Sequence, residues 1–565
     1  MALVISPREV EAFLASRDLL QQYREDYEGA CASFRWPQLR EFNWAVDYFD
    51  NYATGNSQIA LWIVDETGEE HQLTFQELSR RSTQVANFLC RHQVGPGDRI
   101  LVMLPNITPI WEIMLAALKI GAIVIPASTL LTAEDLCDRV QRGEVSHIVT
   151  VPEAIERFAH VPGNYQRILV GEAERDWLRY EDSHGEPAHL RTAPSLPVDS
   201  PYILYFTSGT TALPKMVLHT RQSYPVGHLA TMYWIGLRSD DVHLNISSPG
   251  WAKHAWSCVF APWNAGATVF VHNYKRFDPQ KTLEVIARCG VTSLCAPPTV
   301  WRMLVLQELS SYHTQLRSLV SAGEPLNPEI IQKVRMAWGL DIRDGYGQTE
   351  TVALLGNFPG QPLKLGSVGK PTPGHQLALL DAAGQNMQEG EICLRLQPRP
   401  PSLMTGYIDS PDRTTRATEG GYYRTGDIAS RDADGYFTFV GRADDVFKSA
   451  DYRISPFELE SVLLEHDCVA EAAVVPSPDA IRTSVPKAFI VLKPGMEPSA
   501  DLAKDIFRFL RSRLSPYKRI RRIEFSDLPK TVSGKIRRVE LRKLDIAQRK
   551  ESNRGAQEYL EEQFF

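Results

Sequence analysis

The sequence contains no C-x-x-C pair, no apolar run long enough to cross a bilayer, and no excess of positive charge. Its eight cysteines are scattered, which argues against a zinc site or a disulfide framework and predicts buried thiols. The most apolar stretch, 111–126, is too short for a membrane helix and is interrupted by Glu112 and Lys119. A formal net charge of −7 on 565 residues leaves no overall basic field for nucleic acid or an anionic membrane. We therefore expect no nucleic-acid partner and no membrane span.

The N-terminus lacks the pattern of a secretory leader, because Arg8, Glu9 and Glu11 come before any apolar run could build. The composition, with 43% hydrophobic and 23% charged residues, is that of an ordinary globular chain long enough for several cores. We therefore expect a multidomain cytoplasmic protein.

Strand-like apolar runs alternate with helical patterns along the first part of the chain. Residues 100–104 are typical of a strand, 110–119 of a helix and 122–126 of a second strand, which is the order of a βαβ unit. Further strands and a helix of this kind are expected at 147–151, 267–271, 283–288 and 293–296. We predict an α/β fold with a large N-terminal domain of parallel sheets flanked by helices.

The pattern of apolar runs along the sequence changes after about residue 374. Short runs with frequent Gly and Asp, at 390–396 and 436–440, predict antiparallel strands and a β-rich subdomain. After residue 442 a compact pattern of helices and strands follows, with strands expected at 471–475 and 487–492, and predicts a small α+β domain. We draw the domain boundary between 1–443 and 444–565.

A β-type run at 201–206 leads into a loop, 207–216, that is dense in small hydroxyl residues and contains Lys215. Backbone N–H groups, hydroxyl groups and an ammonium group can together surround the oxygens of a polyphosphate. The Walker spacing is absent, so this is not a P-loop NTPase. A surface turn is the alternative interpretation, because Ser, Thr and Gly occur in turns of every kind.

Five further segments follow in order, and with the 207–216 loop they resemble the motifs of the adenylate-forming superfamily. That superfamily includes acyl-CoA synthetases, luciferases and the adenylation domains of peptide synthetases. The segments are Ser-Ala-Gly-Glu-Pro at 321–325, Asp-Gly-Tyr-Gly-Gln-Thr-Glu at 344–350, Tyr-Arg-Thr-Gly-Asp at 423–427, Val-Gly-Arg-Ala-Asp-Asp at 440–445 and Pro-Lys-Thr-Val-Ser-Gly-Lys at 529–535. The resemblance therefore covers nearly the whole chain.

The resemblance implies that the protein activates a carboxylic acid with ATP. A carboxylate is a poor electrophile, so it is joined to AMP as a mixed anhydride, and cations must offset its repulsion from the triphosphate. By motif, Lys535 lies between the carboxylate and the α-phosphate, Thr349 contacts the α-phosphate, and Glu350 binds Mg²⁺. These three are the expected catalytic residues, and ATP, Mg²⁺ and CoA are the expected cofactors.

The same motifs imply the ATP- and AMP-binding residues. They are Thr207, Ser208, Gly209, Thr210, Thr211, Lys215, Gly323, Glu324, Pro325, Asp344, Gly345, Tyr346, Gly347, Gln348, Asp427, Arg442 and Arg453. Asp427 is suited to the ribose, because a carboxylate can accept two hydrogen bonds from a diol. Asp444 matches the hinge about which the family's C-terminal domain rotates between two half-reactions. We therefore expect 1–443 to hold the acid and ATP sites and 444–565 to be a mobile lid.

The sequence departs from the family pattern in two loops. Ala212 and Met216 stand where the family usually has glycines, at a cost of about 1 kcal/mol if a left-handed backbone is needed. By the resemblance, Ala450 and Asp451 belong to the loop that lines the CoA tunnel in the family, and Asp451 replaces a glycine. Its bulk and charge support an alternative hypothesis, in which the protein only adenylates its acid and passes the acyl group to a separate partner enzyme or a carrier-protein thiol.

Four segments resemble those of medium-chain and aromatic acid–CoA synthetases, at 42–47, 263–266, 276–279 and 296–304. The acid pocket is then expected around Trp251, Trp256, Ala296 and Gly323. Aromatic and small residues side by side favour a bulky apolar acid, with core packing as the alternative role of the two tryptophans.

Three functions remain: an acid–CoA ligase, an adenylating enzyme with another acceptor, and a non-catalytic binding homologue. The intact Lys535, Glu350 and Asp427 argue against the last.

Overall fold

The computed structural model of the chain describes residues 7–172, 174–191, 194–207, 213–449, 452–479, 483–530, 536–550 and 554–565. The chain divides into two units. The first comprises residues 1–377 and 394–423, and the second comprises 378–393 and 424–565. The predicted boundary between residues 443 and 444 was drawn at a hinge, and it stays a prediction.

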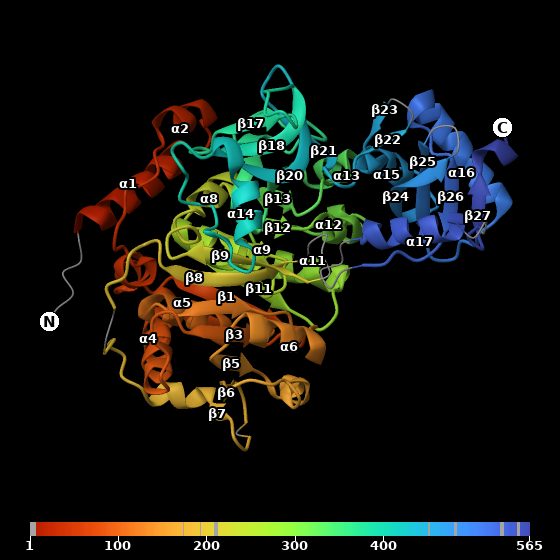
Figure 1. Ribbon diagram of the computed structural model, residues 1–565. Coiled ribbons are helices and arrows are strands. Elements are labelled where there is room, and N and C mark those ends of the chain that lie inside the picture. Colours follow the sequence, from red (N-terminus) through yellow and green to blue (C-terminus); the bar gives the residue numbers. More distant parts are fainter. Residues whose placement is uncertain are drawn as a thin grey trace. The chain divides into compact units, whose positions relative to one another are not determined.

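The larger sheet of the first unit has the strand order β16-β15-β14-β13-β12-β10-β11-β1-β2 (Figure 1). Its inner strands, from β1 to β14, pair in parallel, whereas β2, β15 and β16 add antiparallel edges. The strands are β1 (Ile59–Asp65), β2 (Glu70–Thr74), β10 (Val242–Asn245), β11 (Thr268–Asn273), β12 (Ser293–Ala296), β13 (Ser318–Ala322), β14 (Ile342–Gly347), β15 (Ala353–Gly356) and β16 (Lys370–Pro371).

A second sheet of the same unit has the order β19-β9-β8-β4-β3-β5-β6-β7. Strands β8 to β7 pair in parallel, and β9 and β19 extend the sheet antiparallel beyond β8. Its strands are β3 (Arg99–Met103), β4 (Ile123–Pro126), β5 (His147–Thr150), β6 (Gln166–Leu169), β7 (Leu178–Arg179), β8 (Pro201–Thr207), β9 (Lys215–Thr220) and β19 (Gly406–Tyr407). The predicted α/β fold with parallel sheets is therefore confirmed.

Helices connect and cover these sheets. They are α1 (Pro7–Gln22), α2 (Tyr27–Ser33), η1 (Trp44–Asp50), α3 (Asn51–Ala53), α4 (Phe75–Arg91), α5 (Pro109–Ile120), α6 (Ala133–Arg142), η2 (Pro152–Ala154), α7 (Ile155–Phe158), η3 (Tyr180–Gly185), α8 (Leu229–Ile235), α9 (Ala252–Ala255), η4 (Trp256–Phe260), α10 (Ala261–Ala265), α11 (Pro279–Arg288), α12 (Pro298–Leu304), η5 (Leu309–Ser311), α13 (Pro328–Trp338), α14 (Pro411–Ala417) and η6 (Glu419–Gly421). Two of them, η1 and η4, are π-helices, a form that often occurs at functional sites.

Helix α5 corresponds to the most apolar stretch of the sequence and is buried along its length. Its two charged residues are both paired. Glu112 contacts Arg81 at 3.2 Å, and the Lys119 ammonium lies 2.8 Å from the Asp50 carboxylate. Burial lowers the pKa of Lys119, which the Asp50 charge opposes. A helix that is apolar all round belongs inside a protein, and charges buried with it need partners.

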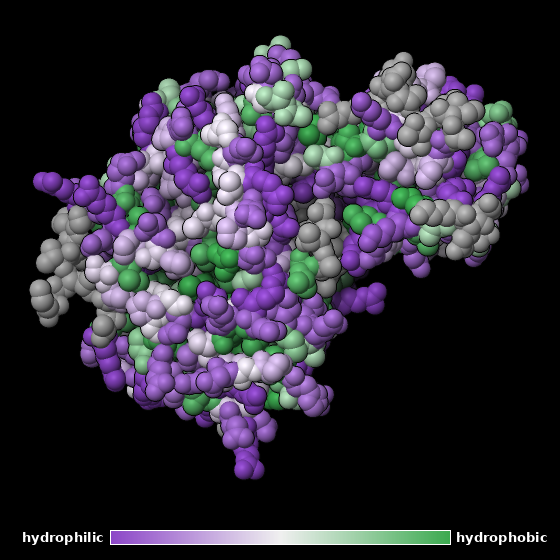
Figure 2. Space-filling model, viewed as in Figure 1, coloured by the Kyte–Doolittle hydropathy of each residue, from purple (hydrophilic) through white to green (hydrophobic). Residues whose placement is uncertain are grey.

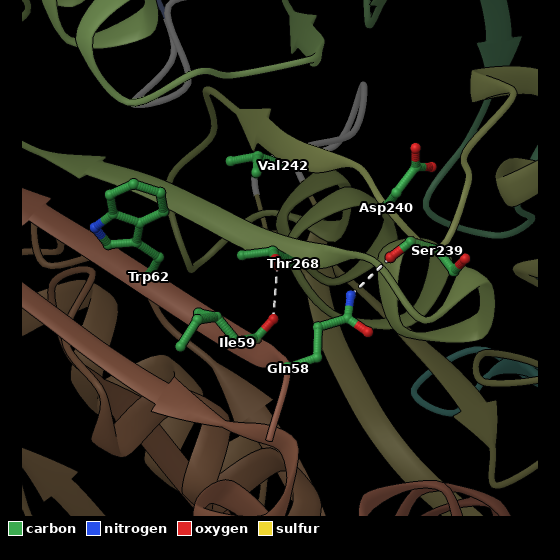
Figure 3. A pocket seen from close by; sticks show the side chains of 7 residues that line it. All are labelled: Gln58, Ile59, Trp62, Ser239, Asp240, Val242 and Thr268. Carbon is green, nitrogen blue, oxygen red and sulfur yellow. Dashed lines mark hydrogen bonds between the residues drawn. The ribbon is translucent and has the colours of Figure 1, made fainter. Parts of the chain in front are cut away.

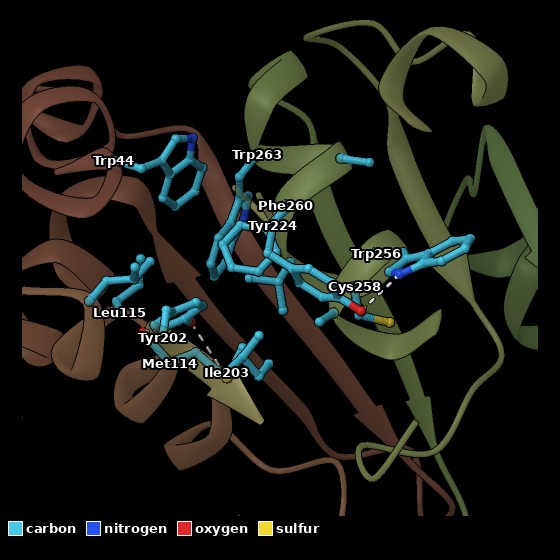
Figure 4. Packing of buried hydrophobic residues seen from close by; sticks show 14 of the residues in the cluster. Trp44, Met114, Leu115, Tyr202, Ile203, Tyr224, Trp256, Cys258, Phe260 and Trp263 are labelled. Carbon is cyan, nitrogen blue, oxygen red and sulfur yellow. Dashed lines mark hydrogen bonds between the residues drawn. The ribbon is translucent and has the colours of Figure 1, made fainter. Parts of the chain in front are cut away.

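Large aromatic side chains fill the core of the first unit. Figure 4 shows Trp44, Trp263 and Phe260 in one buried cluster with Tyr202 of β8. The Trp44 and Phe260 ring centroids lie 5.3 Å apart. The indole N–H of Trp263 donates to the Ala60 carbonyl at 3.0 Å, so this buried polar group is satisfied. The cluster holds η4 and its tryptophan in a fixed position.

Most residues of the second unit lie in the C-terminal part of the chain, blue in Figure 1. A small sheet has the order β17-β18-β20-β21, a hairpin joins β22 and β23, and a further sheet has the order β24-β25-β26-β27. The elements are β17 (Leu377–Leu380), β18 (Glu389–Arg395), β20 (Tyr422–Arg431), β21 (Phe437–Arg442), β22 (Phe447–Ser449), β23 (Tyr452–Ile454), α15 (Pro456–Leu464), β24 (Val469–Asp479), β25 (Thr483–Leu492), α16 (Ala500–Arg513), η7 (Pro516–Lys518), β26 (Arg522–Phe525), α17 (Arg538–Lys550), β27 (Glu558–Leu560) and η8 (Glu561–Gln563).

The C-terminal tail is built into this last sheet. Strand β27 pairs with β26, and Glu561 contacts Arg511 at 2.8 Å and also Arg521. The buried Lys487 ammonium lies 2.8 Å from the Asp545 carboxylate of α17. The tail therefore closes the core of the second unit.

The described helices all fall short of the length and apolar character that a bilayer crossing needs. The face in Figure 2 is mostly hydrophilic, with apolar residues in small scattered patches. All eight cysteines are free thiols, and five of them are buried; Cys31 and Cys137 are half-buried and Cys90 is exposed. The expectation that all are buried is therefore wrong for these three.

Candidate active site

Three neighbouring parallel strands bring predicted site residues to one edge of the larger sheet. Ala296 is the last residue of β12, and Gly323, Glu324 and Pro325 follow the end of β13. Tyr346 and Gly347 end β14, and Gln348, Thr349 and Glu350 come next. In open parallel sheets ligands bind outside the carboxyl ends of the strands. The topology thus assembles a site from segments that are separate in the sequence.

The hairpin of β8 and β9 carries the predicted phosphate loop. Its register places Thr207 opposite Lys215, at the two ends of that loop. The Lys215 ammonium lies 3.9 Å from the Glu350 carboxylate and 5.2 Å from the centre of the Tyr407 ring. The structure therefore brings together a phosphate-loop lysine and the predicted metal ligand. Ser208, Gly209, Thr210, Thr211 and Ala212 lie outside the described residues.

The surroundings of Glu350 fit an Mg²⁺ ligand that acts together with phosphate oxygens. Its side chain is largely buried, and one carboxylate oxygen accepts a hydrogen bond from the Tyr407 hydroxyl at 2.8 Å. Burial, followed by the Glu350 charge, raises the pKa of Tyr407, so the hydroxyl keeps the proton that it donates. The described residues contain no cluster of three or more metal-ligating side chains. Magnesium commonly uses one or two carboxylates with phosphates rather than an all-protein cage.

Three residues that the sequence analysis did not assign hold this motif in place. Tyr407 contacts Glu350, the His219 ring lies 2.7 Å from the Thr349 carbonyl oxygen, and Tyr423 donates to the Gln348 side chain at 2.9 Å. Tyr423 begins a recognised motif, and His219 lies on β9 only four residues after Lys215, so a motif lay close to both in the sequence. Tyr407 lies in no motif, and only pairing of β19 with β9 brings it near.

The Asp344 side chain links the 344–350 motif to the segment that follows the 321–325 motif. Its carboxylate accepts backbone N–H groups from Leu326 at 3.1 Å and from Gly345 at 3.0 Å. Gly323 turns with φ +114°, a conformation that side chains rarely adopt. The Asp344 carboxylate therefore fixes the loop that follows this turn. Burial raises the pKa of Asp344 to about 7, against the effect of the two N–H groups.

Asp344→Asn is expected to flatten the pH dependence of stability. The folded-state pKa of about 7 lies above the unfolded value, so Asp344 stabilises the fold most below about pH 4. That contribution is lost as the pH rises toward and through 7, with a slope of at most about 1.4 kcal/mol per pH unit. Thermal melts of both proteins between pH 4 and 8 measure this, and equal slopes contradict the prediction.

Close packing joins the nucleotide motif to the predicted acid pocket. A Cβ atom at Gly347 would lie 2.7 Å from the Trp256 ring, so the tryptophan lies directly against this glycine. The Trp256 indole donates to the Tyr224 hydroxyl at 3.0 Å, as Figure 4 shows. Ala296 is fully buried, and Trp251 is half-buried as the N-cap of α9. Trp256 also belongs to the core cluster, so the core role of this tryptophan holds too.

The remaining predicted residues belong to the second unit. Asp427 of β20 and Arg442 of β21 are paired in register, and their charged groups lie 3.3 Å apart. Arg453 lies on β23 opposite Lys448. The Asp444 carbonyl accepts a hydrogen bond from Arg542 of α17. Ala450, Asp451 and Lys535 lie outside the described residues.

A pocket of about 450 Å³ lies at the amino ends of three strands of the larger sheet (Figure 3). Its lining includes Ile59, Val242 and Thr268, the first residues of β1, β10 and β11. These are the amino ends of parallel strands, opposite to the edge where the motifs gather. The pocket is therefore separate from the candidate active site.

Fold and site together define a nucleotide-dependent activating enzyme, and the chain belongs to the AMP-binding enzyme family. The family model described as "AMP-binding enzyme" matches residues 50–408, and "AMP-binding enzyme C-terminal domain" matches residues 458–535. The predicted superfamily is thereby confirmed.

Named relatives and solved structures cover most of the chain. It is 44% identical over 537 residues to 4-hydroxybutyrate--CoA ligase 1 of Metallosphaera sedula, covering 92% of this chain and 94% of that protein. It is 40% identical over 548 residues to the mitochondrial acyl-coenzyme A synthetase ACSM3 of Mus musculus, covering 93% and 94%. The structure of the anthranilate CoA ligase AuaEII in complex with anthranoyl-AMP is similar with a TM-score of 0.82 and 28% identity, covering 90% of this chain and 98% of that one.

Proposed function

We propose that this protein is an AMP-forming acid–CoA ligase. It joins a carboxylic acid to AMP with release of pyrophosphate and then transfers the acyl group to CoA. The observation that carries the proposal is the approach of Lys215 to Glu350 within 3.9 Å, at the carboxyl edge of the larger sheet. Membership of the AMP-binding family and relatives named as CoA ligases and acyl-CoA synthetases support it.

Each group has a role that follows from charge. Lys215 and the hydroxyl groups of the phosphate loop would bind the β- and γ-phosphates, and Lys535 would stabilise the charge that develops as the acid attacks the α-phosphate. Glu350 would hold Mg²⁺, which supplies positive charge against the phosphate oxygens when bound. Asp427 would accept the ribose hydroxyls. The 444–565 domain would turn about Asp444 between the two half-reactions.

The proposed substrate is a bulky apolar acid. Buried Trp256 and Ala296 support it, since apolar walls fix such ligands by burial. The relatives' names include one short hydroxy acid, 4-hydroxybutyrate, and an aromatic acid, anthranilate. The experiment that tests the substrate must therefore include both short hydroxy acids and aromatic acids.

Delivery to a partner enzyme or a carrier-protein thiol is the second candidate, and Asp451 in place of a glycine favours it. We also propose a cytoplasmic location, which the free thiols of all eight cysteines support.

The test is incubation with ATP and Mg²⁺ plus acetate, 4-hydroxybutyrate, octanoate, benzoate or anthranilate, with and without CoA, followed by mass spectrometry. We expect acyl-CoA from the apolar acids. Adenylate without thioester supports the second candidate, and in that case Asp451→Gly should restore transfer. Absence of both products with every acid contradicts the proposal.

A further inference from the structure

We propose that His219 is a positioning residue. Its side chain fixes the Thr349–Glu350 peptide to the β8–β9 hairpin, so that Glu350 is placed to bind Mg²⁺ beside the phosphates. The inference rests on the proposed function and concerns a fully buried residue that acts through the backbone of Thr349.

The hydrogen-bond partners of His219 determine which ring nitrogen carries the proton. Nε2 lies 2.7 Å from the Thr349 carbonyl oxygen, which can only accept, so Nε2 carries the hydrogen. Burial lowers the pKa of His219 to about 3, so the ring is neutral and Nδ1 accepts. Its partner is the Ser223 hydroxyl at 2.9 Å, which itself accepts the Thr220 N–H at 2.8 Å. The Thr349 carbonyl therefore sets the tautomer, and the turn after β9 orients the ring through Ser223.

The peptide that His219 holds is also fixed by residues 404–407, which include the short strand β19. The Glu350 carbonyl accepts the N–H of Met404, and the Glu350 carboxylate accepts the hydroxyl of Tyr407 on β19. Strand β19 pairs with β9, the strand that carries both Lys215 and His219. The antiparallel pair of β9 and β19 thus positions both the lysine of the phosphate loop and the carboxylate proposed to bind Mg²⁺.

The bond from His219 is a direct side-chain link from β9 to the backbone of this motif. Thr349 and Glu350 follow the end of β14 in a turn, outside the ladder of the larger sheet. Without the bond, the peptide loses one of its anchors, and a displacement of about 1 Å near reacting groups can cost about 100-fold in rate. The His219 ring also packs against Tyr224 with centroids 4.4 Å apart, which leaves little room for another orientation.

Two substitutions separate the hydrogen bond from the bulk of the side chain. The amide of His219→Gln reaches the place of Nε2 and can donate to Thr349. The shorter amide of His219→Asn reaches only the place of Nδ1, near Ser223. We expect His219→Asn to lower acid-dependent pyrophosphate exchange by about 10- to 100-fold and His219→Gln to recover most of that loss.

The control is another buried histidine with the same kind of partners. His147 has Nδ1 3.0 Å from the Ser146 hydroxyl and Nε2 3.0 Å from the His92 carbonyl, at the amino end of β5. His147→Asn therefore removes an equivalent structural bond away from the site. It should lower the melting temperature without changing the Mg²⁺ concentration that gives half-maximal exchange, which His219→Asn should raise several-fold.

Two further measurements do not depend on turnover of the Mg²⁺-loaded enzyme. Calorimetry of ATP binding with Mg²⁺ and with EDTA should give a gain in affinity on Mg²⁺ addition for wild type and His219→Gln, and a smaller gain for His219→Asn. Thioester formation from supplied acyl-adenylate should change by less than about threefold in all variants, because that step does not need the triphosphate contacts.

The inference is overturned if His219→Asn matches wild type in exchange and in ATP affinity, if Gln and Asn are equally impaired, or if His147→Asn reproduces the Mg²⁺ effect. If His219→Asn does not fold, Ser223→Ala decides: loss of the Nδ1 partner removes the hydrogen bond that orients the ring, so exchange should fall several-fold, and an unchanged rate overturns the inference. A wild-type protein without exchange activity contradicts the proposed function instead, and calorimetry of ATP binding then still tests His219.

Discussion

Glu350→Gln is expected to lower the rate of acyl-adenylate formation by about 100- to 1,000-fold, the usual effect of removing one charge-stabilising group from an active site. The amide has the same size and still offers an oxygen to the Tyr407 hydroxyl, which now donates to the carboxylate at 2.8 Å. What is lost is the negative charge that faces Lys215 and that we propose as the Mg²⁺ ligand. Acid-dependent pyrophosphate exchange across a series of Mg²⁺ concentrations measures the effect.

The matched control is Tyr407→Phe. It removes the hydrogen bond but keeps the carboxylate charge and the aromatic ring beside Lys215. A hydrogen bond to a charged group contributes about 1.5–3 kcal/mol, so a loss of roughly 10- to 100-fold is expected, smaller than that of Glu350→Gln. If Glu350→Gln stays within about threefold of wild type, Glu350 has no role in the metal-dependent step.

Lys535→Ala is expected to abolish adenylation almost completely, by about 100- to 1,000-fold, while transfer from supplied acyl-adenylate to CoA continues. The physical reason is the repulsion between a carboxylate and a triphosphate, which at intermediate dielectric opposes their approach by several kcal/mol. A lysine between them offsets it only in the first half-reaction. Exchange kinetics and single-turnover thioester formation, measured on the same preparation, separate the two steps.

Lys530→Ala is the control for this prediction. Lys530 carries the same charge in the same segment, but its ammonium lies 2.7 Å from the Glu471 carboxylate within the second unit. Its removal should change adenylation by less than about threefold, since a partly exposed ion pair contributes little. Equal losses in both half-reactions of Lys535→Ala would mean that the substitution damages the fold, and no loss would mean that the motif assignment is wrong.

Secondary structure in the first unit followed closely from the sequence. The predicted strands at 100–104 and 122–126 are β3 (Arg99–Met103) and β4 (Ile123–Pro126), and the helix between them is α5. Apolar periodicity is strong there because both faces of these elements are buried. The predicted strands at 471–475 and 487–492 are longer in the structure, as β24 and β25. Pairing along the whole hairpin extends them through residues whose own strand preference is weak.

The C-terminal tail shows what the sequence could not decide. It contains none of the six motifs, and nothing local indicated that Asp545 would meet the buried ammonium of Lys487. Partners 58 positions apart leave no periodic signal, so their contact exists only once β25 and α17 pack together.

The sequence by itself determined the family and the α/β class and proposed the motif residues, because chemistry that binds ATP needs particular side chains at short spacings along the chain. It also made Glu350 and Lys215 candidates for one site. Only the tertiary structure decided that they meet, and that His219 and Tyr407 hold the peptide between them. Those contacts join residues 130 and 57 positions apart, and hydrogen bonds over such separations depend on how β9, β19 and the end of β14 are packed.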